Sequence, residues 1–179
     1  MEKIIIKPLI EIEEKLLRDA KNHLEKIFNL KVGNSPHFLN LDFTFNPRRN
    51  QYLASAILDE MEKFKKDFSE KWLAICDVDL YSQGLNFIFG EANINSGVSI
   101  ISLTRLRQEF YGLSKDKKLF IERIKKEAVH ELGHLFFLNH CQNSKCVMHF
   151  SNSLADTDEK EANFCQKCKV NLQFYLGKK

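Results

Sequence analysis

The five residues from His130 to His134, H-E-L-G-H, constrain the fold more than any other part of this chain. Residues four apart lie on one face of an α-helix, so both imidazoles can bind one metal ion if the segment is helical. Glu131 lies about a third of a turn round the helix, where it could reach a metal-bound water. Imidazole nitrogen suits Zn²⁺, and three protein ligands leave a fourth position for water, whose pKa falls toward about 7. The pattern is therefore typical of metal-dependent hydrolases.

The same letters also arise by chance, as two ordinary helix histidines with an unrelated glutamate between them. Context favours the metal site, because the pattern falls on an amphipathic segment late in the chain and His140 follows His130 by ten positions. A continuous helix would carry His140 about 15 Å along the axis and some 80° off the face. We therefore expect the helix to stop soon after His134 and the chain to turn back.

Hydrophobic periodicity and turn residues predict alternating strands and helices before this motif. Strands are predicted over residues 3–6, 37–45, 72–80, 86–90 and 98–104, and helices over residues 11–29, 50–68 and from about 114–116 through the motif. The segment after His140 holds no strand-length apolar run. The order βαβαβββα predicts the α/β (α+β) class, with a mixed sheet, packed helices and a small C-terminal lobe.

Length and charge bound the organisation and the partners. A chain of 179 residues with 44% hydrophobic residues can bury one core and is short for two. Its 27 basic and 24 acidic residues leave a formal charge of +3, which excludes a highly charged disordered chain and does not indicate a nucleic-acid partner. Lys7 and Pro8 interrupt the first apolar run, so no signal peptide is predicted, and no segment is long enough to span a membrane. We expect a cytoplasmic monomer.

Four of the five cysteines fall between residues 141 and 168. Thiols stay reduced inside cells, so clustered cysteines favour metal binding over disulfides. Cys76 lies in the apolar run 72–80 and is expected to be a small core residue.

The extended pattern resembles the metzincin zinc signature, in which x-x-G-x-x-H follows H-E-x-x-H. Beyond it, His140-Cys141, Cys146, Met148 and C-x-x-C at 165–168 resemble the archaemetzincin subfamily, whose motif couples a catalytic zinc site to a four-cysteine zinc site. The strict motif covers residues 130–168, and the predicted upstream elements agree with a metzincin N-terminal subdomain. The resemblance implies one catalytic domain over 1–179, with subdomains 1–139 and 140–179. It also implies a twisted mixed sheet with an antiparallel edge strand, an active-site helix and a zinc-stabilised lobe.

This resemblance implies a zinc-dependent peptidase with two Zn²⁺ ions per chain and a peptide or protein substrate. The ligands of the catalytic zinc would be His130, His134 and His140. Glu131 would be the general base that activates the zinc-bound water. Residues 86–95 would contain the edge strand that lines the cleft and pairs with a peptide, although an ordinary protected edge strand fits the same residues.

The second zinc would be structural, and its ligands would be Cys141, Cys146, Cys165 and Cys168. A closed four-cysteine site leaves no position for water, and its binding energy of about 10–16 kcal/mol exceeds what so small a lobe gains by burial. Met148 would be the methionine of the turn beneath the catalytic ligands, a role almost the same as that of a gap-filling core methionine.

Three features depart from the family pattern. Phe137 replaces the signature glycine, and a left-handed residue with a Cβ costs about 1–2 kcal/mol. Either Phe137 is strained or the helix ends differently, and we expect Asn139 to help reverse the chain. The spacer between Met148 and the next cysteine is one residue shorter than expected, a cheap change in a loop. Phe150 lies where some metzincins have a tyrosine, and His149 beside it is expected to face solvent.

The departures at Phe137 and Phe150 motivate a second hypothesis, a catalytically weak or silent zinc protein that binds a peptide or protein partner. A third hypothesis, nucleic-acid binding through the cysteine lobe, rests on Lys169 and the tail 177–179. These basic residues are few, and acidic residues lie nearby at 156–161, so we expect a solvated surface and no nucleic-acid partner.

Overall fold

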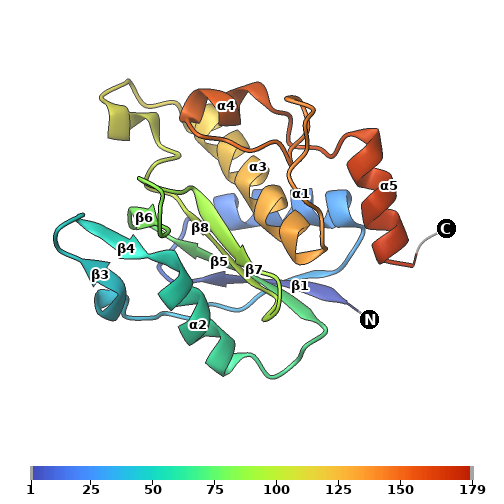
Figure 1. Cartoon of the computed structure of the whole chain (residues 1–179), viewed down its shortest axis with the longest axis horizontal. Helices are drawn as coiled ribbons and strands as arrows, with labels where there is room; N and C mark the ends of the chain where they lie inside the picture. Colours follow the sequence, from blue (N-terminus) through green and yellow to red (C-terminus); the bar gives the residue numbers. More distant parts are fainter. Residues whose placement is uncertain (1, 178–179) are drawn as a thin grey trace.

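The computed structural model describes residues 2–177, which fold around a five-stranded mixed sheet (Figure 1). The strands run in the order β2-β1-β5-β8-β7, and the first four are parallel neighbours. Strand β7 pairs antiparallel with β8 at the edge. The predicted class, a mixed sheet with an antiparallel edge strand, is confirmed. The bounds are β1 Lys3–Pro8, β2 Val32–Asn34, β5 Glu70–Cys76, β7 Gly90–Asn93 and β8 Val98–Ser102.

Helices cover both faces of this sheet. Helices α1 (Glu14–Phe28) and α3 (Lys117–Leu135) share one apolar core with one face, and α2 (Ala54–Phe64) shares a second core with the other. Alternate residues of β5 serve the two cores: Leu73 and Ile75 face the first, and Ala74 faces the second. A strand buried on both faces reads as a continuous apolar run, which explains why this strand was found from the sequence.

The C-terminal segment forms a lobe beside α3. It contains α4 (Leu154–Glu159) and α5 (Gln166–Tyr175), and the first core extends into it. Arg123 of α3 forms two hydrogen bonds to the Asp158 carboxylate, at 2.7 and 2.6 Å. The Lys126 ammonium donates to the carbonyl oxygens of Thr157 and Asp158, at the C-terminal end of α4. Because cations stabilise helix C-termini, these contacts fix the lobe to α3.

The predicted strand over 37–45 is wrong. The structure has a 3₁₀ turn η1 (Asp42–Thr44) followed by the two-residue strand β3 (Phe45–Asn46). Asn40 accepts a hydrogen bond from the Asp42 N–H, and the Thr44 hydroxyl donates to the Leu41 carbonyl. These local side-chain bonds replace a strand ladder. The alternation of apolar residues did not mark a buried face, since Phe43 is exposed.

Other predicted boundaries also shift. The helix predicted over 50–68 is preceded by strand β4 (Gln51–Leu53) and ends at Phe64, because residues 51–53 pair with β3 and with β6 (Leu80–Tyr81). The strand predicted over 86–90 is a loop, and β7 begins only at Gly90. Strand β2 was missed because only Val32 of its three residues is buried. A second 3₁₀ turn, η2, spans Gln108–Tyr111.

Cys76 lies fully buried in the second core, as predicted, and burial raises the pKa of its thiol to about 12. Within residues 2–177, no helix has both the length and the apolar character needed to cross a membrane.

Candidate active site

The last two turns of α3 carry His130 and His134, and the segment after the helix brings His140 beside them. Asp116 caps the helix by accepting a hydrogen bond from the Leu119 N–H, and the helix then continues through the H-E-L-G-H residues. The ring centroids of His130, His134 and His140 lie 4.7, 4.9 and 5.3 Å apart. Their ligand nitrogens lie within 4.8 Å of one another. The third histidine is therefore within reach because the chain turns back after α3.

Two backbone carbonyls fix the orientation of the helix histidines. His130 Nδ1 lies 2.8 Å from the Val147 oxygen, and His134 Nδ1 lies 2.8 Å from the Leu138 oxygen. A carbonyl only accepts, so each Nδ1 carries the proton and each Nε2 keeps its lone pair. The two Nε2 atoms are 3.1 Å apart. Tetrahedral Zn²⁺ with bonds of about 2.0–2.1 Å separates two nitrogen ligands by about 3.3–3.4 Å, so these residues fit a zinc ion.

Desolvation favours the neutral form of all three imidazoles, of which His130 is buried, His134 is partly buried and His140 is exposed. It lowers the pKa of His134 to about 4, lowers that of His130 well below its usual value, and lowers that of His140. The positive charge of Lys160 acts in the same direction on all three rings. Neutral imidazole is the form that binds a metal ion.

Glu131 is 4% exposed beside these rings. Burial raises the pKa of its carboxyl well above the usual value, and the negative charge of Glu127 raises it further. The positive charge of Lys160 partly offsets this shift. A perturbed carboxyl group in a cavity is typical of a functional site.

Helix α3 ends at Leu135, and Phe137, two residues later, is left-handed with φ 62°. The Phe137 N–H donates to the His134 carbonyl at 2.9 Å, and the Leu138 N–H donates to the Gly133 carbonyl at 3.0 Å. This pair of bonds is the Schellman pattern, in which the left-handed position is usually glycine. The expectation that Asn139 reverses the chain is wrong, because Phe137 itself takes the strained conformation.

The four predicted cysteines also converge. The sulfur atoms of Cys141, Cys146, Cys165 and Cys168 lie within 4.8 Å of one another, and all four are free thiols. The Cys141 and Cys165 sulfurs are 3.7 Å apart. Tetrahedral Zn²⁺ with Zn–S bonds of about 2.3 Å separates two sulfurs by about 3.8 Å, so the cluster fits zinc as well.

The thiols of this cluster lie in different environments. A hydrogen bond from the Cys168 N–H lowers the pKa of Cys165 to about 7, and Cys165 also precedes the first turn of α5. Burial raises the pKa of Cys146 and of Cys168.

Met148 links the two clusters. Its carbonyl accepts a hydrogen bond from the Cys141 N–H at 2.9 Å, and its side chain is fully buried beneath α3. A Cβ atom on Gly133 would lie 2.5 Å from the Met148 sulfur, so the absence of a side chain at Gly133 lets Met148 pack against the helix. His149 is half-buried, with Nδ1 2.8 Å from the Cys141 oxygen. His149 was expected to face solvent, and it does so only in part.

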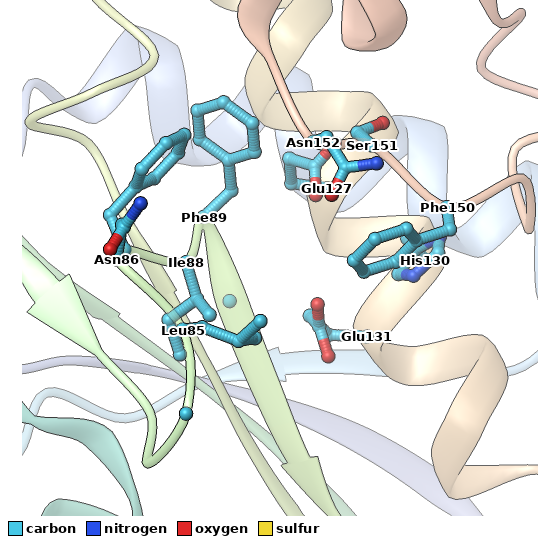
Figure 2. Close-up of a pocket in the computed structure, with 13 residues that line it drawn as sticks. Leu85, Asn86, Ile88, Phe89, Glu127, His130, Glu131, Phe150, Ser151 and Asn152 are labelled. Atoms are coloured by element: carbon cyan, nitrogen blue, oxygen red, sulfur yellow. The ribbon is translucent and has the colours of Figure 1, made fainter.

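A cavity of about 240 Å³ lies beside Glu131. Figure 2 shows the loop 85–89 on one side of it and Glu127, Glu131, His130 and Phe150 on the other. The Phe150 ring also lies 5.0 Å from the His140 ring. The cavity therefore forms a cleft between α3 and the segment that leads into β7.

Sequence reasoning missed a buried ion pair at this cavity. The Lys160 ammonium lies 2.9 Å from the Glu127 carboxylate, and the two side chains are 0% and 4% exposed. Thr157 donates a further hydrogen bond to this carboxylate. The available signal was a glutamate one turn before Glu131 on the buried face of the helix.

Gly90 is a second missed residue. A Cβ atom there would lie 2.8 Å from the Glu131 carboxylate and 2.7 Å from the Ile100 carbonyl oxygen. The absence of a side chain at Gly90 therefore lets Glu131 lie against the edge strand. Its only signal in the sequence is a glycine next to a strand pattern.

Side chains from distant segments anchor the loop 84–89. Arg49 donates to the carbonyl oxygens of Leu85 and Asn86, at 2.7 and 2.9 Å, and the Gln51 amide also donates to Asn86. The Arg105 guanidinium lies 4.2 Å from the centre of the Phe87 ring. Within residues 2–177, the only strand-type pairing of this loop is one antiparallel bridge between Ile88 and Leu80, so most of the predicted strand 86–90 is held by side chains from other segments.

Comparison with known proteins decides the family, because residues 4–174 match peptidase family M54. The chain belongs to peptidase family M54. The archaemetzincin of Pyrococcus furiosus is 41% identical, over 98% of this chain and 94% of the relative. The crystal structure of archaemetzincin from Methanopyrus kandleri shares 33% identity, with TM-score 0.85 over 99% of this chain and 96% of that one. A zinc-dependent peptidase from Methanocorpusculum labreanum gives TM-score 0.88 at 33% identity, covering 94% of this chain and 99% of that chain.

Membership of family M54 confirms the resemblance to archaemetzincins. It also makes the chain a zinc metallopeptidase, and therefore an enzyme that acts on peptides or proteins. The alternative of a silent zinc protein is not favoured by these relatives.

Proposed function

We propose that His130, His134 and His140 hold the catalytic Zn²⁺ of this M54 peptidase and that Glu131 is its general base. The observation that carries this proposal is the convergence of three neutral imidazoles at one point beside a buried carboxyl group. The Nδ1 contacts support it, because they leave the two helix Nε2 atoms free and 3.1 Å apart.

The protein residues divide the work of peptide hydrolysis. A bound Zn²⁺ ion supplies Lewis acidity that polarises the scissile carbonyl and lowers the pKa of a water molecule. The Glu131 carboxylate is placed to accept a proton from the attacking water and to pass it to the leaving nitrogen. Gly90 leaves room for this carboxylate against β7, where a bound peptide would lie.

A second zinc ion is proposed at Cys141, Cys146, Cys165 and Cys168, giving two ions per chain. The sulfur separation of 3.7 Å supports this site, and four thiolates would leave no position for water. Its role would be structural, holding the subdomain 140–179 against the subdomain 1–139. Met148 would transmit this order to the catalytic ligands, because it contacts both Gly133 and the backbone of Cys141.

The substrate is proposed to add as an extended strand to the free edge of β7. Strand β7 pairs with β8 on one side, and α3 lies along the same edge of the sheet (Figure 1). Backbone hydrogen bonds would then orient the peptide, and the cavity beside Glu131 would take one side chain of the substrate.

We further propose a cytoplasmic monomer without a nucleic-acid partner. Five free thiols fit a reducing compartment, and the formal charge of +3 is small. Of the basic residues behind the nucleic-acid hypothesis, Lys169 is exposed, and Lys178 and Lys179 lie outside the described residues.

The proposed roles are tested by comparing the wild type with Glu131→Gln and with Glu122→Gln, a control on a partly exposed face of α3. Cleavage of a mixed peptide library is followed by mass spectrometry, and zinc content is measured on each protein. Loss of cleavage in Glu131→Gln alone, at unchanged zinc content, supports the assignment. Full activity of Glu131→Gln would refute it.

A further inference from the structure

We propose that Phe137 determines specificity by forming one wall of a groove for an apolar or aromatic side chain of the substrate. This side chain would belong to the residue about three positions before the scissile bond. The inference rests on the proposed path of the peptide along β7 and adds a second subsite to it, at the opposite end of the edge strand from the cavity beside Glu131.

The Phe137 ring lies on the surface, although its neighbours in the chain do not. Its exposed fraction is 54%, whereas Leu135, Phe136 and Leu138 are at most 4% exposed. The ring lines a groove of about 520 Å³ between α2 and residues 91–95 of β7 and the turn after it. Its apolar lining is Phe137, Leu58, Ala92 and Ile94, and its polar lining is Ser55, Asp59, Glu91, Asn93 and Asn95. An exposed aromatic ring therefore faces the C-terminal end of the edge strand.

The spacing along α3 places this groove relative to the catalytic centre. Glu131 lies against Gly90 at the start of β7, and Phe137 lies beside the end of β7, so helix and strand run in the same direction (Figure 1). Six helical residues span about 9 Å, which equals about three residues of an extended peptide at about 3.3 Å each. If the peptide pairs antiparallel with β7, the residues before the scissile bond lie at the Phe137 end.

Two features hold the ring in this place. One is the left-handed conformation of Phe137. Glycine would adopt this conformation without strain, whereas a bulky residue adopts it only with strain. The other is Tyr175 of α5, whose ring centroid lies 4.8 Å from that of Phe137. Strained residues that persist tend to lie at functional sites, and here the strain accompanies an aromatic surface next to the cleft.

The test uses two peptides that share a sequence cleaved by the wild type and differ only at the third residue before the cleaved bond, Phe in one and Ala in the other. For the wild type we expect kcat/KM to be about 3- to 10-fold higher for the Phe peptide, the range expected of one aromatic contact. In Phe137→Gly and Phe137→Ala, we expect the ratio of the kcat/KM values for the two peptides to fall to near 1. An unchanged preference in both variants would overturn the proposal.

Stability and binding provide readouts that do not depend on turnover. Phe137→Gly relieves the backbone strain and Phe137→Ala does not, so we expect the glycine variant to melt about 2–8 °C above the alanine variant. Loss of preference in both variants, despite this difference in Tm, assigns the effect to the missing ring.

The same peptides are labelled and bound to Glu131→Gln, with and without Phe137→Gly, and fluorescence anisotropy gives Kd. Tighter binding of the Phe peptide only when Phe137 is present supports the inference, and equal Kd values for both peptides overturn it. Failure of the proposed base is distinguishable, because it would appear as full turnover of both peptides by Glu131→Gln.

Discussion

Because Gly133 lies close to Met148, we expect Gly133→Ala to change the free energy of unfolding in opposite directions in the wild type and in a Met148→Ala variant. An alanine Cβ at 133 would lie 2.5 Å from the Met148 sulfur, 3.1 Å from its methyl carbon and 3.4 Å from the Phe164 ring. Non-bonded heavy atoms rest at about 3.5–4.0 Å, so the sulfur must move by about 1 Å. The Met148 side chain is fully buried, and closely packed protein interiors resist a shift of this size.

Overpacking of this kind costs about 1–3 kcal/mol, while alanine in a helix interior gains about 0.5–1 kcal/mol over glycine. We therefore expect Gly133→Ala to lower the free energy of unfolding by about 1–2 kcal/mol in the wild type. In a Met148→Ala background the sulfur is absent, and Gly133→Ala should then raise the free energy of unfolding by about 0.5–1 kcal/mol. The coupling between the two sites is then about 1.5–3 kcal/mol.

Urea denaturation of the four zinc-loaded proteins measures this cycle, with metal content checked on each. Met61→Ala is the matched control, because Met61 is a fully buried methionine of the other core. Gly133→Ala should be additive with Met61→Ala within about 0.5 kcal/mol. If the effects of Gly133→Ala and Met148→Ala were also additive within about 0.5 kcal/mol, the proposed packing of Met148 against Gly133 would be refuted.

Three further substitutions test the cleft. Gly90→Ala should lower kcat by about 10- to 100-fold at unchanged zinc content, because its Cβ displaces Glu131; unchanged kcat contradicts this. Lys160→Met should cost about 3–5 kcal/mol in urea denaturation by leaving Glu127 buried and unpaired, and adding Glu127→Gln should recover part of that loss. Arg49→Ala removes two hydrogen bonds to the loop 84–89 and should raise KM with little change in Tm. A large loss of stability would contradict a local role of Arg49 in holding this loop.

The sequence predicted those parts of the site that depend on local spacing. His130 and His134 share a helix face by the geometry of the helix alone, and the apolar runs of β1, β5 and β8 mark strands covered on both faces. The ion pair of Lys160 with Glu127 could not be predicted, because it joins segments far apart in the chain. The contact of Gly90 with Glu131 is hidden for the same reason.

Errors arose where tertiary contacts or local hydrogen bonds outweighed the pattern. The alternation in 37–45 predicted a strand, but Asn40 and Thr44 satisfy the backbone locally. The sequence showed that Phe137 replaces the signature glycine. Because asparagine adopts the left-handed conformation more readily than phenylalanine, the turn was nevertheless expected at Asn139. Packing of Phe136 and Leu138 into the core on either side fixes the turn at Phe137 despite its strain.

The central claim, two zinc sites with different donor atoms, is tested most directly by zinc analysis and X-ray absorption on the purified protein. We predict two Zn²⁺ ions per chain, one bound by four sulfur atoms and one by nitrogen and oxygen only. Cys168→Ser should remove the signal of the zinc bound by sulfur. His134→Ala should remove the signal of the zinc bound by nitrogen and leave the sulfur site intact. One ion per chain, or a single site with mixed nitrogen and sulfur ligands, would contradict the account.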